Sequence, residues 1–295
     1  MEFKRKPEWL KISLPSKGKY TEIKKILKEL NLHTVCVEAK CPNLGQCWGE
    51  GTATFMILGD VCTRYCKFCA TKTGNPQGIV DEDEPRRVAM AIQEMSLDYV
   101  VITSVTRDDL PDGGASIFRR TIEEIKKIKP DVYIEVLVPD FGGVRENIKT
   151  VIEANPTVFA HNVEVVRRLT PLVRDRRASY EKSLSVLNIA KELIPDILTK
   201  SGFMVGLGET FDEVIETMRD LREKGVDFLT IGQYLKPSPK HLEVDRYVTP
   251  EEFKVYEKIG LDMGFKYVAS GPLVRSSYRA GEFFVKKYLQ LDIKK

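Results

Sequence analysis

The loop that organises this chain reads Gly59-Asp60-Val61-Cys62-Thr63-Arg64-Tyr65-Cys66-Lys67-Phe68-Cys69-Ala70. Its three cysteines have the spacing C-x3-C-x2-C, and no fourth Cys or His lies in the segment to complete a tetrahedral zinc site. Three thiolates this close together can instead bind three irons of a cubane cluster and leave the fourth iron open. An open iron can coordinate a substrate or cofactor directly. Three buried structural thiols are the alternative, and they explain so dense a group less well.

The spacing, with an aromatic residue directly before the last cysteine, resembles the signature of the radical S-adenosylmethionine (AdoMet) enzymes. The resemblance implies that Cys62, Cys66 and Cys69 hold a 4Fe–4S cluster whose open iron is chelated by AdoMet. It also implies that one electron from the cluster splits AdoMet to give a 5′-deoxyadenosyl radical. The spacing by itself indicates only a three-thiolate site.

Composition and charge exclude several classes of protein. The 295 residues include 46 Lys and Arg against 43 Asp and Glu, and this balance gives no reason to expect a nucleic-acid partner. No run of about eighteen apolar residues predicts a membrane span, and residues 1–10 lack the apolar core of a secretory signal. All six cysteines fall between positions 36 and 69. We therefore expect free thiols in a reducing compartment, the cytosol.

Strand and helix patterns alternate after the cysteine loop, which predicts an α/β fold with a parallel sheet. The expected helices cover residues 85–95, 116–129, 144–153, 180–193 and 210–224. The expected strands cover residues 52–58, 98–104, 132–138, 157–160, 197–205 and 227–231. Six strands are too few for a closed eight-stranded barrel, and the resemblance implies a partial (β/α)6 TIM-type barrel. Catalytic groups would then lie at the C-terminal ends of the strands.

The chain is expected to form one radical AdoMet domain over residues 1–295, with an extension at each end of the barrel. Residues 1–50 would be the N-terminal extension, residues 51–235 the barrel core and residues 236–295 the C-terminal extension. A helix beyond Pro250 and a short apolar run at 265–269 belong to the last part.

A second cysteine group, Cys36, Cys41 and Cys47, has the spacing C-x4-C-x5-C. A zinc knuckle is one interpretation, although zinc sites favour C-x2-C pairs and a fourth soft ligand. Partial ligation of the same cluster as the later triplet is another. A second iron–sulfur cluster is the better interpretation, and its fourth ligand must be another residue type because the chain has no seventh cysteine.

The two cysteine groups and Arg275-Ser276-Ser277-Tyr278 together resemble the lipoyl synthase family, over nearly the whole chain from Cys36 to Ala280. The resemblance implies that Cys36, Cys41 and Cys47 share an auxiliary 4Fe–4S cluster with a serine of this motif. The family's ligand aligns with Ser277. A serine oxygen binds iron more weakly than a thiolate does, which suits a cluster that must be taken apart. Alternatively, Ser276 and Ser277 cap a helix beginning at Tyr278.

The reaction implied is sulfurtransferase chemistry, the insertion of two sulfur atoms at C6 and C8 of an octanoyl chain on a carrier lysine. These carbons have no acidic proton, so hydrogen-atom abstraction by a radical must replace acid–base catalysis. The auxiliary cluster would supply the sulfur. The implied partners are an octanoylated H protein or E2 lipoyl domain, or an octanoyl-lysine peptide. The other implied partners are a reduced electron donor, such as ferredoxin or flavodoxin, and a cluster-repair protein.

Candidate AdoMet contacts follow the ends of the expected strands. They are Thr103, Ser104, Asn162, Glu164, Arg174, Gly208 and Tyr234. Arg174 could pair with the AdoMet carboxylate. A lone His161 is better explained as a structural histidine, and Thr210 as a helix cap explains much of the Gly206–Thr210 segment.

The sequence leaves three alternatives open. The basic stretches Lys4-Arg5-Lys6 and 174–177 could meet an acidic carrier domain or could be solvated surface. The enzyme could insert sulfur into a different substrate. An iron–sulfur carrier or sensor is less consistent with two three-cysteine groups, because carriers saturate each cluster with four cysteines.

Overall fold

The computed structural model describes residues 6–11, 17–49 and 53–277. Its main sheet has eight strands in the order β1-β2-β5-β6-β7-β8-β9-β10. The strands are β1 (His33–Thr34), β2 (Thr54–Ile57), β5 (Tyr99–Ser104), β6 (Tyr133–Leu137), β7 (Val158–Ala160), β8 (Leu198–Val205), β9 (Phe228–Gln233) and β10 (Tyr267–Gly271). All neighbours from β2 to β10 pair in parallel, whereas β1 runs antiparallel to β2.

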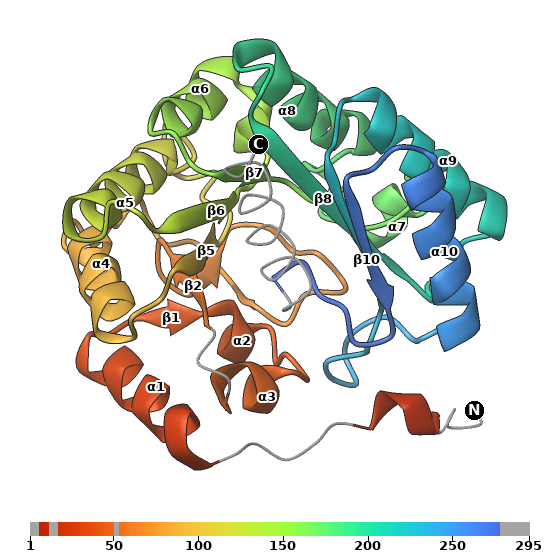
Figure 1. Cartoon of the computed structure of the whole chain (residues 1–295), viewed down its shortest axis with the longest axis horizontal. Helices are drawn as coiled ribbons and strands as arrows, with labels where there is room; N and C mark the ends of the chain where they lie inside the picture. The colour runs from red at the N-terminus through yellow and green to blue at the C-terminus, as the bar shows by residue number, and fades with distance from the viewer. Residues whose placement is uncertain (1–5, 12–16, 50–52, 278–295) are drawn as a thin grey trace.

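The predicted six parallel strands are confirmed as β2, β5, β6, β7, β8 and β9. The count of six was one parallel strand short, because the apolar run at 265–269 forms β10, which pairs with β9 from Tyr267 opposite Phe228. The antiparallel edge strand β1 was also missed, because two residues are too few to show a pattern. The sheet curves into a barrel (Figure 1), which stays open because no pairing joins β1 to β10 within the described residues.

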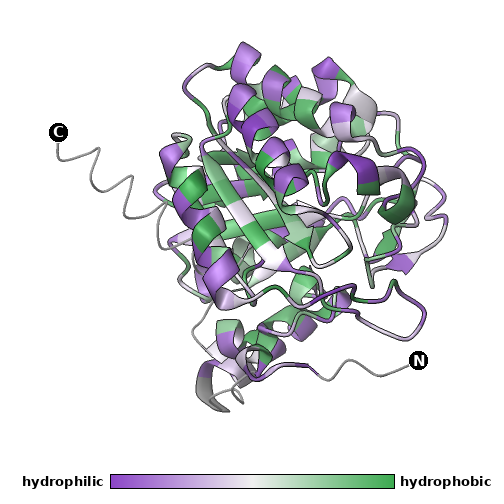
Figure 2. Cartoon of the chain, turned by 90° about the vertical axis from the view of Figure 1, so that its right-hand side faces the viewer, coloured by the Kyte–Doolittle hydropathy of each residue, from purple (hydrophilic) through white to green (hydrophobic). Residues whose placement is uncertain are grey.

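Helices surround the outside of this sheet (Figure 1). They are α4 (Glu84–Glu94), α5 (Ala115–Ile128), α6 (Arg145–Glu153), α8 (Tyr180–Leu193), α9 (Phe211–Glu223) and α10 (Pro250–Asp262). The helices carry both hydrophilic and hydrophobic residues, whereas the strands that they cover are largely hydrophobic (Figure 2). Strands buried on both faces are expected of a parallel sheet covered by crossover helices. No helix in the described part of the chain is long and apolar enough to cross a membrane.

Local sequence fixes where several of these helices begin. The side chain of Ser179 accepts a hydrogen bond from the backbone N–H of Lys182 at the start of α8. Thr210 forms a capping box with Glu213 at the start of α9, as the sequence predicted for this threonine. Thr249 caps α10, whose first residue is Pro250.

The N-terminal segment lies against the open edge of the barrel. It contains α1 (Lys17–Glu29), β1, α2 (Val35–Glu38) and α3 (Leu44–Gly49). The pairing of His33 with Met56 and of Thr34 with Phe55 brings α2 beside the start of β2. Trp48 of α3 is buried, and its ring lies 5.3 Å from that of Tyr20 on α1. These contacts hold the first cysteine group against the barrel.

Candidate active site

A cavity of about 670 Å³ opens at the C-terminal ends of the parallel strands. It is lined by all six cysteines, Cys36, Cys41, Cys47, Cys62, Cys66 and Cys69, and by Ser276 and Ser277. The two cysteine groups therefore face one space, although one comes from the N-terminal segment and the other from the loop after β2. The C-terminal serines reach the same space from beyond β10.

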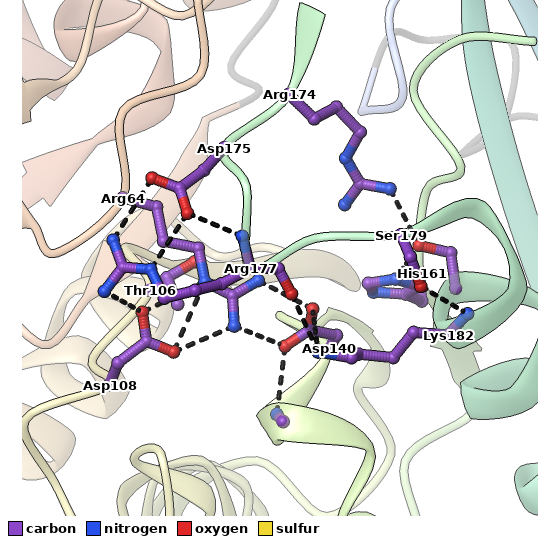
Figure 3. A network of polar contacts seen from close by, with 12 residues as sticks. Arg64, Thr106, Asp108, Asp140, His161, Arg174, Asp175, Arg177, Ser179 and Lys182 are labelled. Carbon is purple, nitrogen blue, oxygen red and sulfur yellow. Dashed lines mark hydrogen bonds and ion pairs between the residues drawn. The ribbon is translucent and has the colours of Figure 1, made fainter. Parts of the chain in front are cut away.

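Arg64, inside the C-x3-C-x2-C loop, anchors that loop to the barrel (Figure 3). Its guanidinium is only 6% exposed and donates hydrogen bonds to Asp108, at 2.8 and 3.0 Å, and to Asp140, at 2.6 and 2.7 Å. Asp108 follows β5 and Asp140 follows β6. Burial alone would raise the pKa of Asp140, but the hydrogen bonds and charge of Arg64 lower this pKa to about 2. The carboxylate is therefore ionised, and the loop is held to two strand ends.

Asp175, beyond β7, makes a second anchor for the same loop. Its carboxylate accepts a hydrogen bond from the backbone N–H of Tyr65 at 2.9 Å, and its own N–H points to the Cys66 sulfur at 3.3 Å. The side chain of Arg177 pairs with Asp175 (Figure 3). It also donates a hydrogen bond to the carbonyl of Thr63. Hydrogen bonding to Arg177 holds the pKa of Asp175 well below its usual range.

Four of the cavity thiols, Cys36, Cys41, Cys66 and Cys69, favour the protonated form at neutral pH in the absence of metal. Burial raises the pKa of Cys66 to about 11 and also raises the pKa values of Cys36, Cys41 and Cys69. Metal binding must therefore release protons. No three His, Cys, Asp or Glu side chains in the described ranges are arranged to hold a single metal ion. A 4Fe–4S cluster does not need such convergence, because each of its cysteines binds a different iron.

The segment after β10 passes close to both β9 and the first cysteine group. A side chain at Gly232 would overlap the carbonyl oxygen of Val274, since its Cβ would lie 2.2 Å away. Asn43, 1% exposed, donates to the carbonyl of Leu273 at 2.7 Å. Arg275 is close enough for its charge to lower the pKa of Cys41, against the larger effect of burial. Residues 273–277 are thereby fixed beside the first cysteine group.

One hydrogen bond joins Ser276 to the end of β7. The Nδ2 of Asn162 donates to the Oγ of Ser276 at 2.7 Å. Asn162 also forms a hydrogen bond with the carboxylate of Glu164. Burial raises the pKa of this carboxyl group. Glu164 has a φ of 70°, an uncommon conformation for a residue with a side chain. Tyr278 lies outside the described residues, so the alternative that the serines cap a helix beginning there stays a prediction.

Two predicted cofactor residues present polar atoms that lack a partner. Arg174 is 9% exposed; its Nη1 donates to the Oγ of Ser183 at 2.8 Å, whereas its Nε has no hydrogen-bond partner among the described residues. Ser104 Oγ is likewise buried and unpartnered within the described ranges. Both residues line the cavity, as does Thr103, whose hydroxyl donates to the carbonyl of Leu137. Unpaired buried polar groups are costly, so these atoms are suited to a polar ligand.

His161 is a structural residue, as its isolation in the sequence indicated. Its ring nitrogens contact the carbonyl of Val138 at 2.8 Å and the hydroxyl of Ser183 at 3.0 Å. Burial lowers its pKa to about 4, so it is neutral at physiological pH. Through Ser183 it fixes the position of Arg174.

The expected contact at Gly208 is not supported, because this residue does not line the cavity. Its carbonyl accepts a hydrogen bond from the exposed Arg168, and its φ is 98°. The turn is instead explained by Glu209, whose carboxylate accepts from the N–H groups of Gly206 and Leu207. Tyr234 does line the cavity, although its hydroxyl is already used by the carbonyl of Leu242.

The sequence reasoning missed Arg64, Asp140 and Asp175 as residues that shape the site. The available signal was their position, because Arg64 lies between Cys62 and Cys66 and Asp140 follows a strand end. Of the basic stretches, Lys6 lines the cavity mouth and Arg174 lies inside the cavity, whereas Lys4 and Arg5 fall outside the described residues.

Comparison with known proteins identifies the family of this chain. Residues 56–221, more than half of the chain, match the model of the radical SAM superfamily. Residues 1–41 match the N-terminal domain of lipoyl synthase of that family. Lipoyl synthase of Thermus thermophilus is 60% identical over 283 residues, which cover 96% of this chain and 88% of that protein. Lipoyl synthase of Pyrobaculum arsenaticum is 59% identical over 280 residues, 94% of each chain.

Solved structures with low sequence identity share the fold. The FeFe-hydrogenase maturase HydG from Carboxydothermus hydrogenoformans aligns with a TM-score of 0.58 at 14% identity, covering 92% of this chain and 78% of that one. Methylornithine synthase aligns with a TM-score of 0.53 at 10% identity, covering 96% and 94%. From the cysteine loop, the parallel barrel and these relatives, we conclude that the chain belongs to the lipoyl synthase family of the radical SAM superfamily.

Proposed function

We propose that this chain inserts the two sulfur atoms of the lipoyl group with two 4Fe–4S clusters held in one cavity. Cys62, Cys66 and Cys69 would hold the cluster that binds AdoMet. Cys36, Cys41, Cys47 and Ser277 would hold a second cluster that supplies the sulfur. The observation that supports this arrangement is that all seven side chains line the same cavity, although they span positions 36 to 277 of the sequence.

The residues present fit the groups that the family requires. The thiols belong to the ligand class that iron–sulfur clusters use. The unpartnered Nε of Arg174 and Oγ of Ser104 could receive the polar end of AdoMet, with Arg174 binding the carboxylate through a charge-assisted hydrogen bond. When bound, the clusters and AdoMet supply a carbon radical and sulfur.

The protein's own contribution is to position the substrate and to exclude water. The cavity wall includes Met56, Leu137, Val138, Phe203 and Met204, which suit an eight-carbon acyl chain. His161 cannot act as a general acid at neutral pH, since burial lowers its pKa to about 4. This is consistent with a reaction at unactivated carbon, where proton transfer has no role. An apolar, enclosed wall also limits quenching of reactive species.

The choice of Ser277 over Ser276 as the fourth ligand has support from one contact. The hydroxyl of Ser276 accepts a hydrogen bond from Asn162 at 2.7 Å, which gives that serine a positioning role. Ser277 comes next in a segment that Asn43 and Gly232 hold beside the first cysteine group. We infer that Ser276 aligns the segment and that Ser277 binds iron.

The substrate would be an octanoyl-lysine on a lipoyl carrier domain such as H protein or an E2 domain. A reduced ferredoxin or flavodoxin would supply electrons, and a separate protein would rebuild the spent cluster. The family requires an octanoylated protein and an electron donor; the particular partners are part of the proposal.

Paired variants test the assignment of the two clusters. Cys41→Ala and Ser277→Ala should abolish sulfur insertion into an octanoyl-lysine peptide, while reductive cleavage of AdoMet to 5′-deoxyadenosine continues. Cys62→Ala should abolish both. Ser276→Ala is the matched control for Ser277→Ala and should keep its full iron content. Loss of both activities in a folded Cys41→Ala protein would argue against separate roles for the two groups.

A further inference from the structure

Three lysines from separate parts of the chain line the cavity. Lys6 precedes the short helix η1 (Glu8–Leu10), Lys40 follows α2, and Lys236 follows β9. Lys6 and Lys40 are exposed, and neither has an ion-pair partner among the described residues. Lys236 is partly exposed and pairs with Glu243. We call these three residues the cationic rim, because exposed residues that line a cavity lie at its mouth.

Glu243 balances the charge of Lys236, whereas no carboxylate among the described residues pairs with Lys6 or Lys40. The acidic side chains that line it are Asp140 and Glu164. Asp140 is 1% exposed and is paired with Arg64, and Glu164 lies on the inner wall beside Asn162. The mouth is therefore positively charged, although the whole chain carries a net charge of only +3.

Lys40 has a backbone conformation that disfavours a lysine. Its φ is 51°, in the left-handed region, directly after α2. The N–H of Lys40 bonds to the carbonyl of Val37, and the N–H of Cys41 bonds to that of Cys36. This is the Schellman arrangement, in which glycine is the usual residue. A lysine in a strained position at a cavity mouth indicates a role for its side chain beyond ending the helix.

The substrate that we propose above has two parts with different chemistry. The octanoyl chain is uncharged, and its reacting carbons must reach the cysteines inside the cavity, so it gives the lysines nothing to bind. AdoMet has an interior partner in Arg174. The remaining part of the complex is the polypeptide around the modified lysine, which must stay at the mouth while the acyl arm extends inward.

We propose that the cationic rim binds an acidic stretch of the carrier polypeptide that flanks the octanoylated lysine. This inference rests on the proposed substrate and specifies how it is recognised. Charge at the edge of an interface contributes mainly to selectivity and to the rate of encounter. The rim would therefore favour a carrier lysine that has acidic neighbours over other lysines.

Direct binding of labelled peptides tests this proposal without any turnover. Two octanoyl-lysine peptides of equal length would be compared by fluorescence anisotropy with the reconstituted protein: one has Asp and Glu beside the modified lysine, and the other has Asn and Gln there. The acidic peptide should bind more tightly at low salt, and the preference should shrink in about 0.5 M salt, where exposed charges are screened.

Lys6→Gln and Lys40→Gly should each weaken binding of the acidic peptide by about two- to fivefold, typical of an exposed ion pair. Binding of the neutral peptide should not change.

Three controls separate recognition from damage to the fold. Lys254→Gln removes an exposed lysine on α10 outside the cavity and should leave both affinities unchanged. Lys40→Gly suits the left-handed backbone, so its melting temperature should not fall, whereas Lys40→Arg should keep the charge and the affinity. Iron content would show that the neighbouring Cys41 site is intact.

Equal affinity of the two peptides at low salt, or an unchanged acidic preference in the Lys6→Gln and Lys40→Gly proteins, would overturn the proposal. A loss of AdoMet affinity without a change in peptide affinity would also overturn it, because the rim would then serve the cofactor. If the acidic preference holds but neither peptide gains sulfur, the proposed substrate is wrong and the rim recognises another acidic polypeptide.

Discussion

Replacing Arg64 with methionine removes the cation that two aspartates share beneath the cysteine loop. Asp140 is 1% exposed and would keep only weaker contacts, with the N–H of Gly142 at 2.9 Å and with the Nζ of Lys182 at 4.0 Å. We expect Arg64→Met to destabilise the apoprotein by about 3–5 kcal/mol at pH 7, the usual cost of removing one member of a buried ion pair.

The pKa of Asp140 gives an independent estimate of this effect. Its value of about 2 in the folded protein, against an ordinary 3.8, corresponds to about 2.5 kcal/mol of stability at neutral pH. Because the folded-state pKa is lowered, this stability is present above pH 3.8 and is lost as the pH falls toward 2. In Arg64→Met, burial would raise the pKa of Asp140 instead. Asp140 of the variant would then take up its proton above pH 3.8, where the wild-type carboxylate stays ionised, so the stability difference between the two proteins should narrow as the pH is lowered from 7 toward 3.8.

Urea unfolding of the apoproteins, followed by circular dichroism, measures the difference. Arg145→Met is the matched control, since Arg145 and Glu192 form an ion pair at the surface with side chains 47% and 50% exposed. Its cost should be below about 1 kcal/mol. The double variant Arg64→Met/Asp140→Leu should recover most of the lost stability, because no unpaired charge remains. Equal costs for Arg64→Met and Arg145→Met, or no recovery in the double variant, would refute the reasoning.

Three further variants probe other parts of the site. Gly232→Ala places a methyl group 2.2 Å from the backbone oxygen of Val274 and should displace residues 273–277. Iron analysis of this variant should then show the loss of one cluster. The matched control is Gly271→Ala, whose methyl group meets only a Val274 side-chain carbon at 3.3 Å, and it should retain both clusters. The wild-type protein should lose about 3 kcal/mol of unfolding free energy between pH 6.5 and 4, because the folded state holds the pKa of His161 at about 4. His161→Gln should remove most of this loss. If the urea midpoints of the variant fell with pH as steeply as those of the wild type, His161 would not be responsible. Arg174→Gln should weaken AdoMet binding by at least about tenfold in calorimetry, from the loss of a charge-assisted hydrogen bond, and unaltered affinity would exclude Arg174 from the cofactor site.

Local patterns in the sequence predicted most of the barrel. Strands buried on both faces appear as β-branched runs, and the helices between them begin at recognisable caps such as Ser179 and Thr210. The strand β10 was missed because its residues, Tyr267–Gly271, include Ser270 and Gly271 and show a shorter apolar run. Its pairing with β9 depends on tertiary contacts that no local pattern reveals.

The sequence predicted which residues gather at the site better than it predicted which of them bond to one another. The cysteine groups have diagnostic spacings, whereas Arg64 meets Asp140 across 76 positions and Asn162 meets Ser276 across 114. Such pairs are brought together by the order of strands in the sheet. Gly208 is the opposite case, since a short glycine pattern suggested a ligand contact, whereas the residue lies outside the cavity lining in a turn held by Glu209.

The most direct test of the two-cluster cavity uses anaerobic protein reconstituted with isotopically labelled sulfide, together with AdoMet, a strong reductant and an octanoyl-lysine peptide. Mass spectrometry of the peptide should show the gain of two labelled sulfur atoms, together with 5′-deoxyadenosine and loss of iron from the protein. Cys41→Ala should form 5′-deoxyadenosine but transfer no sulfur. Unlabelled sulfur in the peptide, or sulfur transfer by Cys41→Ala, would contradict the account.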